Sequence, residues 1–184
     1  MKILITGIGI VGKSTLRRML YQFFSFQNLN VKHYDADNFA HLRHPIDQSC
    51  IKPEEFSQSN IYLIEDIHGP IESQCLFPLA TYDLILYLYC DRLNHTLFQI
   101  SRAVQWLKSG KYDYDTINGW KGSQKPFDPR NILPIIKLIY KNFYRSQKLQ
   151  AKDLLAISAY PHIVIQATWT KSGPAFDFKS SNLK

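Results

Sequence analysis

The chain opens with a short apolar run that gives way to an amphipathic pattern. Residues 2–6 read Lys-Ile-Leu-Ile-Thr and are followed by Gly7, which is typical of a short buried strand. From Ser14 to Gln27 the large apolar residues then recur at the spacing of one helix face. They are Leu16, Met19, Leu20, Phe23 and Phe24. The pattern predicts a strand, a glycine-containing loop and a helix in succession.

Further apolar runs alternate with helical patterns along the rest of the chain. The further predicted strands are 31–34, 61–64, 84–89 and 162–166. Two long stretches with helical spacing, about 93–108 and 132–155, lie between the strands 84–89 and 162–166. Because strands covered on both faces are almost continuously apolar, and because crossovers between parallel strands are right-handed, we expect an α/β fold with three layers. It would have a parallel five-stranded sheet with helices on both faces.

The length of 184 residues, with 45% hydrophobic positions, suits a single domain with its own core. We expect this domain to span residues 1–170, with a loop or lid at 110–131 that is rich in Lys, Tyr, Asp, Gly and Pro, and a loosely held tail at 171–184. The chain has no apolar run of about 18 residues, no signal-peptide pattern and no paired cysteine spacing. We therefore expect a cytoplasmic protein with no membrane partner.

The net charge of +7 is concentrated in the second half of the chain, where residues 91–184 carry 15 Lys and Arg against 6 Asp and Glu. Such a surplus fits a lid that clamps phosphates, a surface that meets nucleic acid, or a solvated basic face. Composition does not choose among these three interpretations.

Residues 7–14 read Gly-Ile-Gly-Ile-Val-Gly-Lys-Ser and match the pattern GxxxxGK[ST] in full. They lie after a predicted strand and at the start of a predicted helix, as the mechanism of this motif requires. Glycines let the backbone wrap so that its N–H groups point inward, and the helix N-terminus adds positive potential. We call residues 7–14 the phosphate loop. Its placement makes the expected architecture a three-layer P-loop NTPase fold.

The phosphate loop predicts binding of ATP and Mg²⁺. We expect Lys13 to reach the β- and γ-phosphates as a catalytic residue and the Ser14 hydroxyl to help hold Mg²⁺. The residues expected to contact the nucleotide are Gly7, Gly9, Ile10, Val11, Gly12, Lys13, Ser14 and Thr15.

Acidic residues follow the second and third predicted strands, whose ends should converge on the phosphate site. Asp37, with Asp35 as the second choice, is the candidate for accepting the proton of an attacking hydroxyl, although such residues are also ordinary turn and cap residues. Glu65 or Asp66 is the candidate for holding Mg²⁺, directly or through water. Because successive strand side chains point to opposite faces, we do not expect both to reach one ion.

Three segments together resemble the uridine kinase and phosphoribulokinase group of P-loop kinases. They are the phosphate loop, the Asp-Asn-Phe at 37–39 and the Glu-Asp-Ile-His-Gly at 65–69, which is similar to the Glu-Gly-Ile-His-Gly of that group. The resemblance covers roughly residues 1–90. It implies that the phosphate loop holds ATP, that Asp37 activates the acceptor hydroxyl and that Glu65 lies near metal and substrate. A weaker likeness, at residues 35–40, is to dephospho-coenzyme A kinase.

The chain departs from that group in its lid. The lid helix of the group carries closely spaced arginines after the fourth strand, whereas residues 93–108 contain only Arg102. The resemblance therefore makes Arg102 the catalytic lid cation, and other cations brought over the phosphates would stabilise developing charge in the same way. Those candidates are Arg92, Lys108, Lys111, Lys121, Lys125 and Arg130.

The function expected from these features is ATP-dependent transfer of the γ-phosphoryl group to a hydroxyl of a small metabolite, such as a nucleoside or a related compound. One alternative is a nucleotide-binding regulatory or nucleic-acid-binding protein, because Tyr112, Tyr114 and Trp120 are interleaved with lysines. Another is a GTPase-like switch, since residues 66–69 read DxxG. No Asn-Lys-x-Asp follows the fourth predicted strand, which disfavours that alternative.

Overall fold

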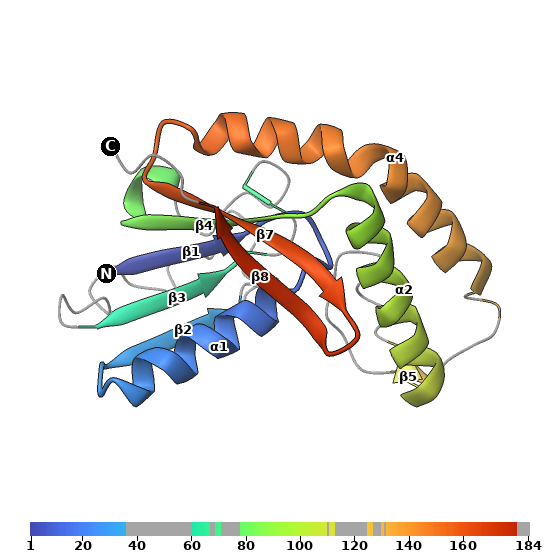
Figure 1. Cartoon of the computed structure of the whole chain (residues 1–184), viewed down its shortest axis with the longest axis horizontal. Helices are drawn as coiled ribbons and strands as arrows, with labels where there is room; N and C mark the ends of the chain where they lie inside the picture. Colours follow the sequence, from blue (N-terminus) through green and yellow to red (C-terminus); the bar gives the residue numbers. More distant parts are fainter. Residues whose placement is uncertain are drawn as a thin grey trace, which may run out of the picture.

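The computed structural model describes residues 1–35, 60–66, 69–70, 78–109, 111–112, 125–126, 130 and 132–179. Its main feature in these ranges is a six-stranded sheet with the order β2-β3-β1-β4-β7-β8 (Figure 1). The strands are β1 (Lys2–Thr6), β2 (Val31–Asp35), β3 (Ile61–Glu65), β4 (Leu84–Tyr89), β7 (His162–Thr170) and β8 (Gly173–Lys179).

The first five of these strands, in sheet order, run parallel to one another. β1 lies between β3 and β4, with Ile5 beside both Glu65 and Leu86. β2 continues the sheet on the other side of β3, where Asp35 pairs with Glu65. Because the strands are parallel, the ends of β1, β2 and β3 lie together at one edge of the sheet. The loop that follows β1 therefore opens beside the residues that follow β3.

Two helices pack on opposite faces of the sheet, α1 (Lys13–Phe26) and α4 (Ile132–Ile157). Side chains alternate across each strand, so Ile5 joins Leu16 of α1 in one cluster while Leu4 joins Ile157 of α4 in the other. Burying each such side chain contributes about 1.5–3 kcal/mol. Alternate burial on two faces is why the strands read as continuous apolar runs.

A third helix, α2 (Arg92–Ser109), lies against α4 and the β7–β8 hairpin (Figure 1). Asp91 caps its first turn, because the Asp91 carboxylate accepts a hydrogen bond from the backbone N–H of Asn94 at 2.8 Å. Trp106 and Ile135 form a small buried contact between α2 and α4. The helix thereby begins directly after β4, close to the edge of the sheet where the phosphate loop lies.

The prediction of a parallel five-stranded sheet, and with it of the P-loop NTPase fold, is wrong. The sheet is mixed and has a sixth strand, since β8 runs antiparallel to β7 from Thr170↔Gly173 to Val164↔Lys179. Residues 173–179, part of the segment expected to be a tail, thus belong to the sheet. The missed signal was the apolar-polar-apolar order of Phe176, Asp177 and Phe178, which puts both rings on one face of a strand. Phe176 packs against the core, while Phe178, next to the end of β8, is exposed.

The expected lid at 110–131 lies largely outside the described residues. Its described parts include β5 (Lys111–Tyr112) and β6 (Lys125–Pro126), which pair antiparallel with each other. A short 3-10 helix, η4 (Leu79–Thr81), precedes β4. In the described ranges we find no helix that has both the length and the apolar character needed to cross a lipid bilayer.

Candidate phosphate-binding site

The phosphate loop leaves β1 and enters α1 through a tightly wrapped backbone. Gly7 has a φ of 143°, and a Cβ placed there would lie 2.5 Å from the carbonyl oxygen of Leu88 on β4. Gly12 has a φ of 88° and is the N-cap residue of α1. Only glycine meets both conditions without strain. The two glycines therefore fix the entry and the exit of the loop.

Ile10 is the strained residue of the loop. Its φ of 60° lies in the left-handed region, which β-branched residues rarely adopt. Strain of this kind costs on the order of 1–3 kcal/mol and persists only where neighbouring contacts hold the backbone in place. The loop conformation is thus imposed by its surroundings.

Lys13 lies under the start of the loop and is only 5% exposed. Its ammonium group donates hydrogen bonds to the carbonyl oxygens of Gly7 and Ile8, at 2.7 and 2.9 Å. These contacts satisfy a buried charge that would otherwise be costly. They also set a full positive charge at the N-terminus of α1, where the helix macrodipole adds about half a charge more.

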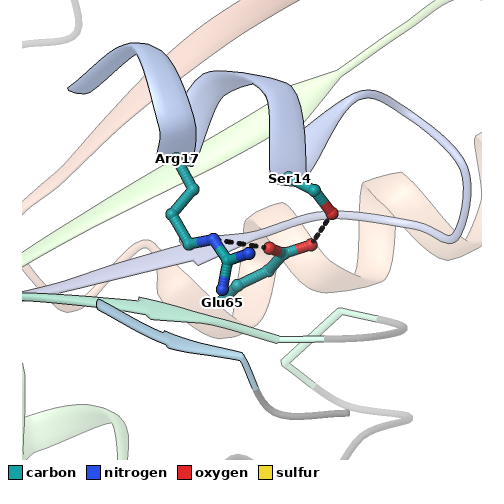
Figure 2. Close-up of polar contacts among 3 residues, drawn as sticks. All are labelled: Ser14, Arg17 and Glu65. Atoms are coloured by element: carbon teal, nitrogen blue, oxygen red, sulfur yellow. Dashed lines mark hydrogen bonds and ion pairs between the residues drawn. The ribbon is translucent and has the colours of Figure 1, made fainter. Parts of the chain in front are cut away.

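Ser14, Arg17 and Glu65 form a polar cluster where α1 meets the end of β3 (Figure 2). The Ser14 hydroxyl donates to Glu65 Oε1 at 2.6 Å. Arg17 Nε lies 3.2 Å from Glu65 Oε2. The carboxylate is therefore shared between a serine hydroxyl and a guanidinium group, one on each oxygen. This cluster joins two of the three residues that the sequence linked to Mg²⁺, Ser14 and Glu65, the third being Asp66.

Arg17 was not among the residues singled out from the sequence. It follows Ser14 by three positions, a spacing that places both side chains on the same side of a helix. This spacing could have pointed to Arg17, but only together with the knowledge that the carboxylate of Glu65 lies next to both side chains.

Asp66 contacts the end of β1. Its Oδ2 accepts a hydrogen bond from the Thr6 hydroxyl at 3.1 Å, and its backbone N–H donates to the carbonyl oxygen of Ile5 at 3.0 Å. Asp66 is thus bound to the end of β1, while Glu65 is the acid that touches Ser14. Alternation along the chain gives the two neighbours these different partners.

His95 of α2 contacts the phosphate loop and, like Arg17, was not singled out from the sequence. It is 3% exposed, and its Nε2 lies 3.0 Å from the carbonyl oxygen of Gly9. The same Nε2 lies 3.1 Å from the side-chain nitrogen of Gln99. Because the Gly9 carbonyl can only accept, its contact with His95 is a hydrogen bond in the tautomer that carries the proton on Nε2. Burial lowers the pKa of His95; the Gly9 carbonyl opposes this shift and the nearby charge of Lys13 adds to it. The ring is therefore neutral at neutral pH.

The contact with His95 also orients the next peptide group. The chain contains no cis peptide among its described residues, so the Gly9–Ile10 amide is trans and planar. Its carbonyl points to α2, and hence the N–H of Ile10 points to the opposite side. His95 thereby determines the direction of one of the loop's backbone donors.

Aromatic side chains pack against the end of the loop. A Cβ placed on Gly12 would lie 3.2 Å from Phe176 of β8 and 3.4 Å from Phe98 of α2. Phe98 also meets Trp169 of β7 edge to face, with ring centroids 5.2 Å apart. The sixth strand, absent from the predicted fold, thus reaches the phosphate loop.

The end of β4 is bound to α4 next to this site. Cys90 donates its backbone N–H to Gln150 Oε1 at 2.9 Å and accepts from Gln150 Nε2 at 2.8 Å. Burial, reinforced by Asp91, raises the pKa of the Cys90 thiol to about 12, against an opposing effect of Lys13. Cys90 is therefore a protonated, buried thiol and not a nucleophile.

The remaining predicted site residues are less well placed. Asp37 lies outside the described residues, and of Asp35 only the backbone position at the end of β2 is described. Arg102 lies over the ring of Trp106 on its own helix, with Cζ 5.7 Å from the ring centroid, a cation–π contact that ties it to α2. Thr15 donates its backbone N–H to Gly12, and Val11 is buried in the core.

Comparison with protein-family models and with curated proteins found no match to this chain.

Proposed function

We propose that this protein is an ATP-dependent phosphotransferase that moves the γ-phosphoryl group to a hydroxyl of a small metabolite, such as a nucleoside or a related compound. The observation that carries the proposal is the 2.6 Å hydrogen bond to Glu65 from Ser14, the last residue of a complete GxxxxGKS sequence. It brings together a hydroxyl and a carboxylate at the N-terminus of a helix, beside a buried lysine.

Phosphate binding is supported by the charge around the loop. Helix N-termini favour anions, and wrapped backbone N–H groups form a concave donor surface. Lys13 adds a cation that is held in place by two carbonyl oxygens. In this proposal the loop and Lys13 bind the β- and γ-phosphates and stabilise the charge that develops during transfer.

The oxygen atoms present at the cluster fit Mg²⁺. This ion is usually held by one or two carboxylates together with substrate phosphates, and the Ser14 hydroxyl and the Glu65 carboxylate supply oxygen ligands of that kind. When bound, Mg²⁺ offsets the negative charge of the phosphates. Arg17 keeps Glu65 oriented through its second oxygen, at 3.2 Å, so that the first oxygen remains directed to Ser14.

The acceptor side of the proposal rests on the sequence. Asp37 is the proposed residue that accepts the proton of the attacking hydroxyl, and it follows β2, whose last residue, Asp35, pairs with Glu65. Catalysis in such a site depends mainly on positioning and electrostatics.

Nucleotide binding is tested first, by titration calorimetry with ATP and with GTP, each with and without Mg²⁺. We expect Mg²⁺-dependent binding of ATP that is at least tenfold weaker in Lys13→Ala, while Lys32→Ala, which removes an exposed lysine of β2, behaves as the wild type. Equal binding by the wild type and Lys13→Ala would overturn the proposal. A clear preference for GTP would favour a GTPase-like switch.

Phosphotransfer is tested by an ATP-consumption screen over nucleosides, pantothenate-like compounds and sugars. Asp37→Ala should retain ATP binding and lose turnover by about 10²–10⁴-fold, the usual contribution of a general base. Asp177→Ala, which removes an exposed carboxylate of β8, is the matched control. Unchanged turnover in Asp37→Ala would exclude it as the base. ATP binding without consumption on any acceptor would favour a nucleotide-binding regulatory protein.

A further inference from the structure

The outer surface of α4 carries a straight row of positive charges. Its members are exposed and follow one another at spacings of four, four, three and four residues; they are Lys137, Lys141, Arg145, Lys148 and Lys152. These spacings keep all five on one side of a helix, along about 22 Å at 1.5 Å per residue. We call these five residues the cationic row.

α4 itself contributes one acidic side chain beside the five cations of the row. The only acidic residue of α4, Asp153, is 2% exposed. It faces the sheet, where its Oδ2 accepts a hydrogen bond from the Tyr87 hydroxyl at 3.0 Å. The row thus accounts for 5 of the 15 Lys and Arg of residues 91–184. A linear set of cations of this kind is complementary to a linear polyanion.

Beside the cationic row lies an exposed pair of aromatic rings. Tyr140 and Tyr144 are 66% and 58% exposed, and their ring centroids are 5.0 Å apart. They occur one helical turn apart, and each comes directly before a member of the row, Lys141 and Arg145. Exposed rings next to a line of cations are the combination that binds single-stranded nucleic acid, with bases on the rings and phosphates on the cations.

A bilayer is a weaker fit to this face. Helices that lie in a membrane interface devote a wide apolar face to lipid, whereas the apolar face of α4 is used for the core through Ile135, Ile157 and their neighbours. Besides the two tyrosines, the large apolar side chains exposed on α4 are Ile132, Leu133, Ile136 and Leu155. Tyrosine rings with polar hydroxyl groups suit base stacking better than burial in lipid.

We infer that the outer face of α4 binds single-stranded nucleic acid, with the cationic row along the phosphates and Tyr140 and Tyr144 against the bases. This activity does not depend on the proposed phosphotransfer, and it is measured without ATP.

The test is fluorescence anisotropy with a labelled 20-nucleotide oligothymidylate at several salt concentrations. Single-strand binding gives a slope of about −0.7 per phosphate contact in a plot of log K against log salt, hence about −3.5 for five contacts. In Lys141→Gln/Lys148→Gln the slope should fall to about −2.1, with about 25-fold weaker binding at 0.1 M salt, from the same relation. The control Lys32→Gln/Lys171→Gln removes equal charge from exposed positions elsewhere and should stay within about twofold of the wild type if only the row contributes.

The tyrosines are tested separately, because stacking and charge have different signatures. Tyr140→Ser/Tyr144→Ser should weaken binding by at least about fivefold per ring while leaving the salt slope unchanged. All substituted side chains are exposed, so circular dichroism and thermal unfolding should match the wild type.

Three results would overturn the inference. One is an equal loss of oligonucleotide affinity in the control and in Lys141→Gln/Lys148→Gln, the row variant, because the effect would then come from net charge alone. Another is binding of a 20-base-pair duplex as tightly as of the single strand, with no effect of the tyrosine variant. The third is binding to phosphatidylcholine–phosphatidylserine vesicles, lost in the row variant, with no binding to the oligonucleotide.

Discussion

Arg17 and Glu65 form a buried ion pair whose energetic coupling can be measured. Their side chains are 11% and 8% exposed, so each charge has been largely removed from water. Removing one partner of such a pair leaves the other charge buried without compensation, which costs about 3–5 kcal/mol. Replacing both by neutral groups of similar shape is often close to neutral. A large loss in each single variant together with a small loss in the double variant would therefore identify a buried, coupled pair.

The perturbations are Arg17→Met, Glu65→Gln and the double variant. Methionine keeps most of the arginine stem, and glutamine keeps an acceptor for the Ser14 hydroxyl at the position of the carboxylate. We expect each single variant to lower the free energy of unfolding by about 3 kcal/mol, the lower end of that range, because both groups retain some solvent contact. The double variant should lose less than either single variant.

Urea unfolding followed by circular dichroism measures these values. With a slope of about 2 kcal/mol per molar urea, a loss of about 3 kcal/mol shifts the midpoint by about 1.5 M. The double-mutant cycle then gives the coupling free energy. Losses that add up in the double variant, or single losses below about 1 kcal/mol, would show a solvated surface pair and would refute the interpretation of Glu65 as a carboxylate held in place by Arg17.

Two further predictions concern the loop itself. Gly7→Ala should destabilise the protein by more than the roughly 1–2 kcal/mol of left-handed strain alone, because its Cβ would lie 2.5 Å from the Leu88 carbonyl oxygen. The control Gly173→Ala, at a residue with a φ of 109° and no atom within 4 Å of the added Cβ, should show only that strain. Equal losses of stability in thermal unfolding of the two variants would contradict the packing argument. Since the pKa of His95 is lowered on folding, the unfolded chain binds the additional proton, so stability should fall as pH drops below about 6.5, by up to about 1.4 kcal/mol per pH unit. In His95→Gln this part of the pH dependence should vanish. If the free energy of unfolding of the wild type and of His95→Gln falls in parallel with pH, His95 is not the group responsible.

Local patterns predicted the helices and most strands well. The apolar runs at 2–6 and 84–89 are β1 and β4 as predicted, since burial on both faces leaves a clear signature. β8 was not among the predicted strands, because the Ser, Gly, Pro and Lys of residues 171–184 resemble the composition of a loop. A strand that depends on its pairing with β7 has little signal of its own.

The contact between Ser14 and Glu65 could be expected from the sequence, while their role in holding a metal ion stays a prediction. Ser14 and Glu65 meet because a glycine loop and the end of a neighbouring parallel strand lie at the same edge of the sheet. Arg17 and His95 were missed for a different reason: their partners, Glu65 and the Gly9 carbonyl, are distant in sequence and follow from the tertiary arrangement. The structure also assigns the Thr6 contact to Asp66, a distinction that the sequence left open.

The phosphate loop is held from three sides. His95 of α2 holds the Gly9 carbonyl, β4 lies against Gly7, and Phe176 of β8 lies against Gly12. These contacts explain how Ile10 is kept in its strained conformation, and they orient backbone donors before a ligand binds. A preformed site loses less conformational entropy on binding. Weakening one of these contacts, as in His95→Gln, should therefore reduce affinity for ATP even though no atom that touches the nucleotide is removed.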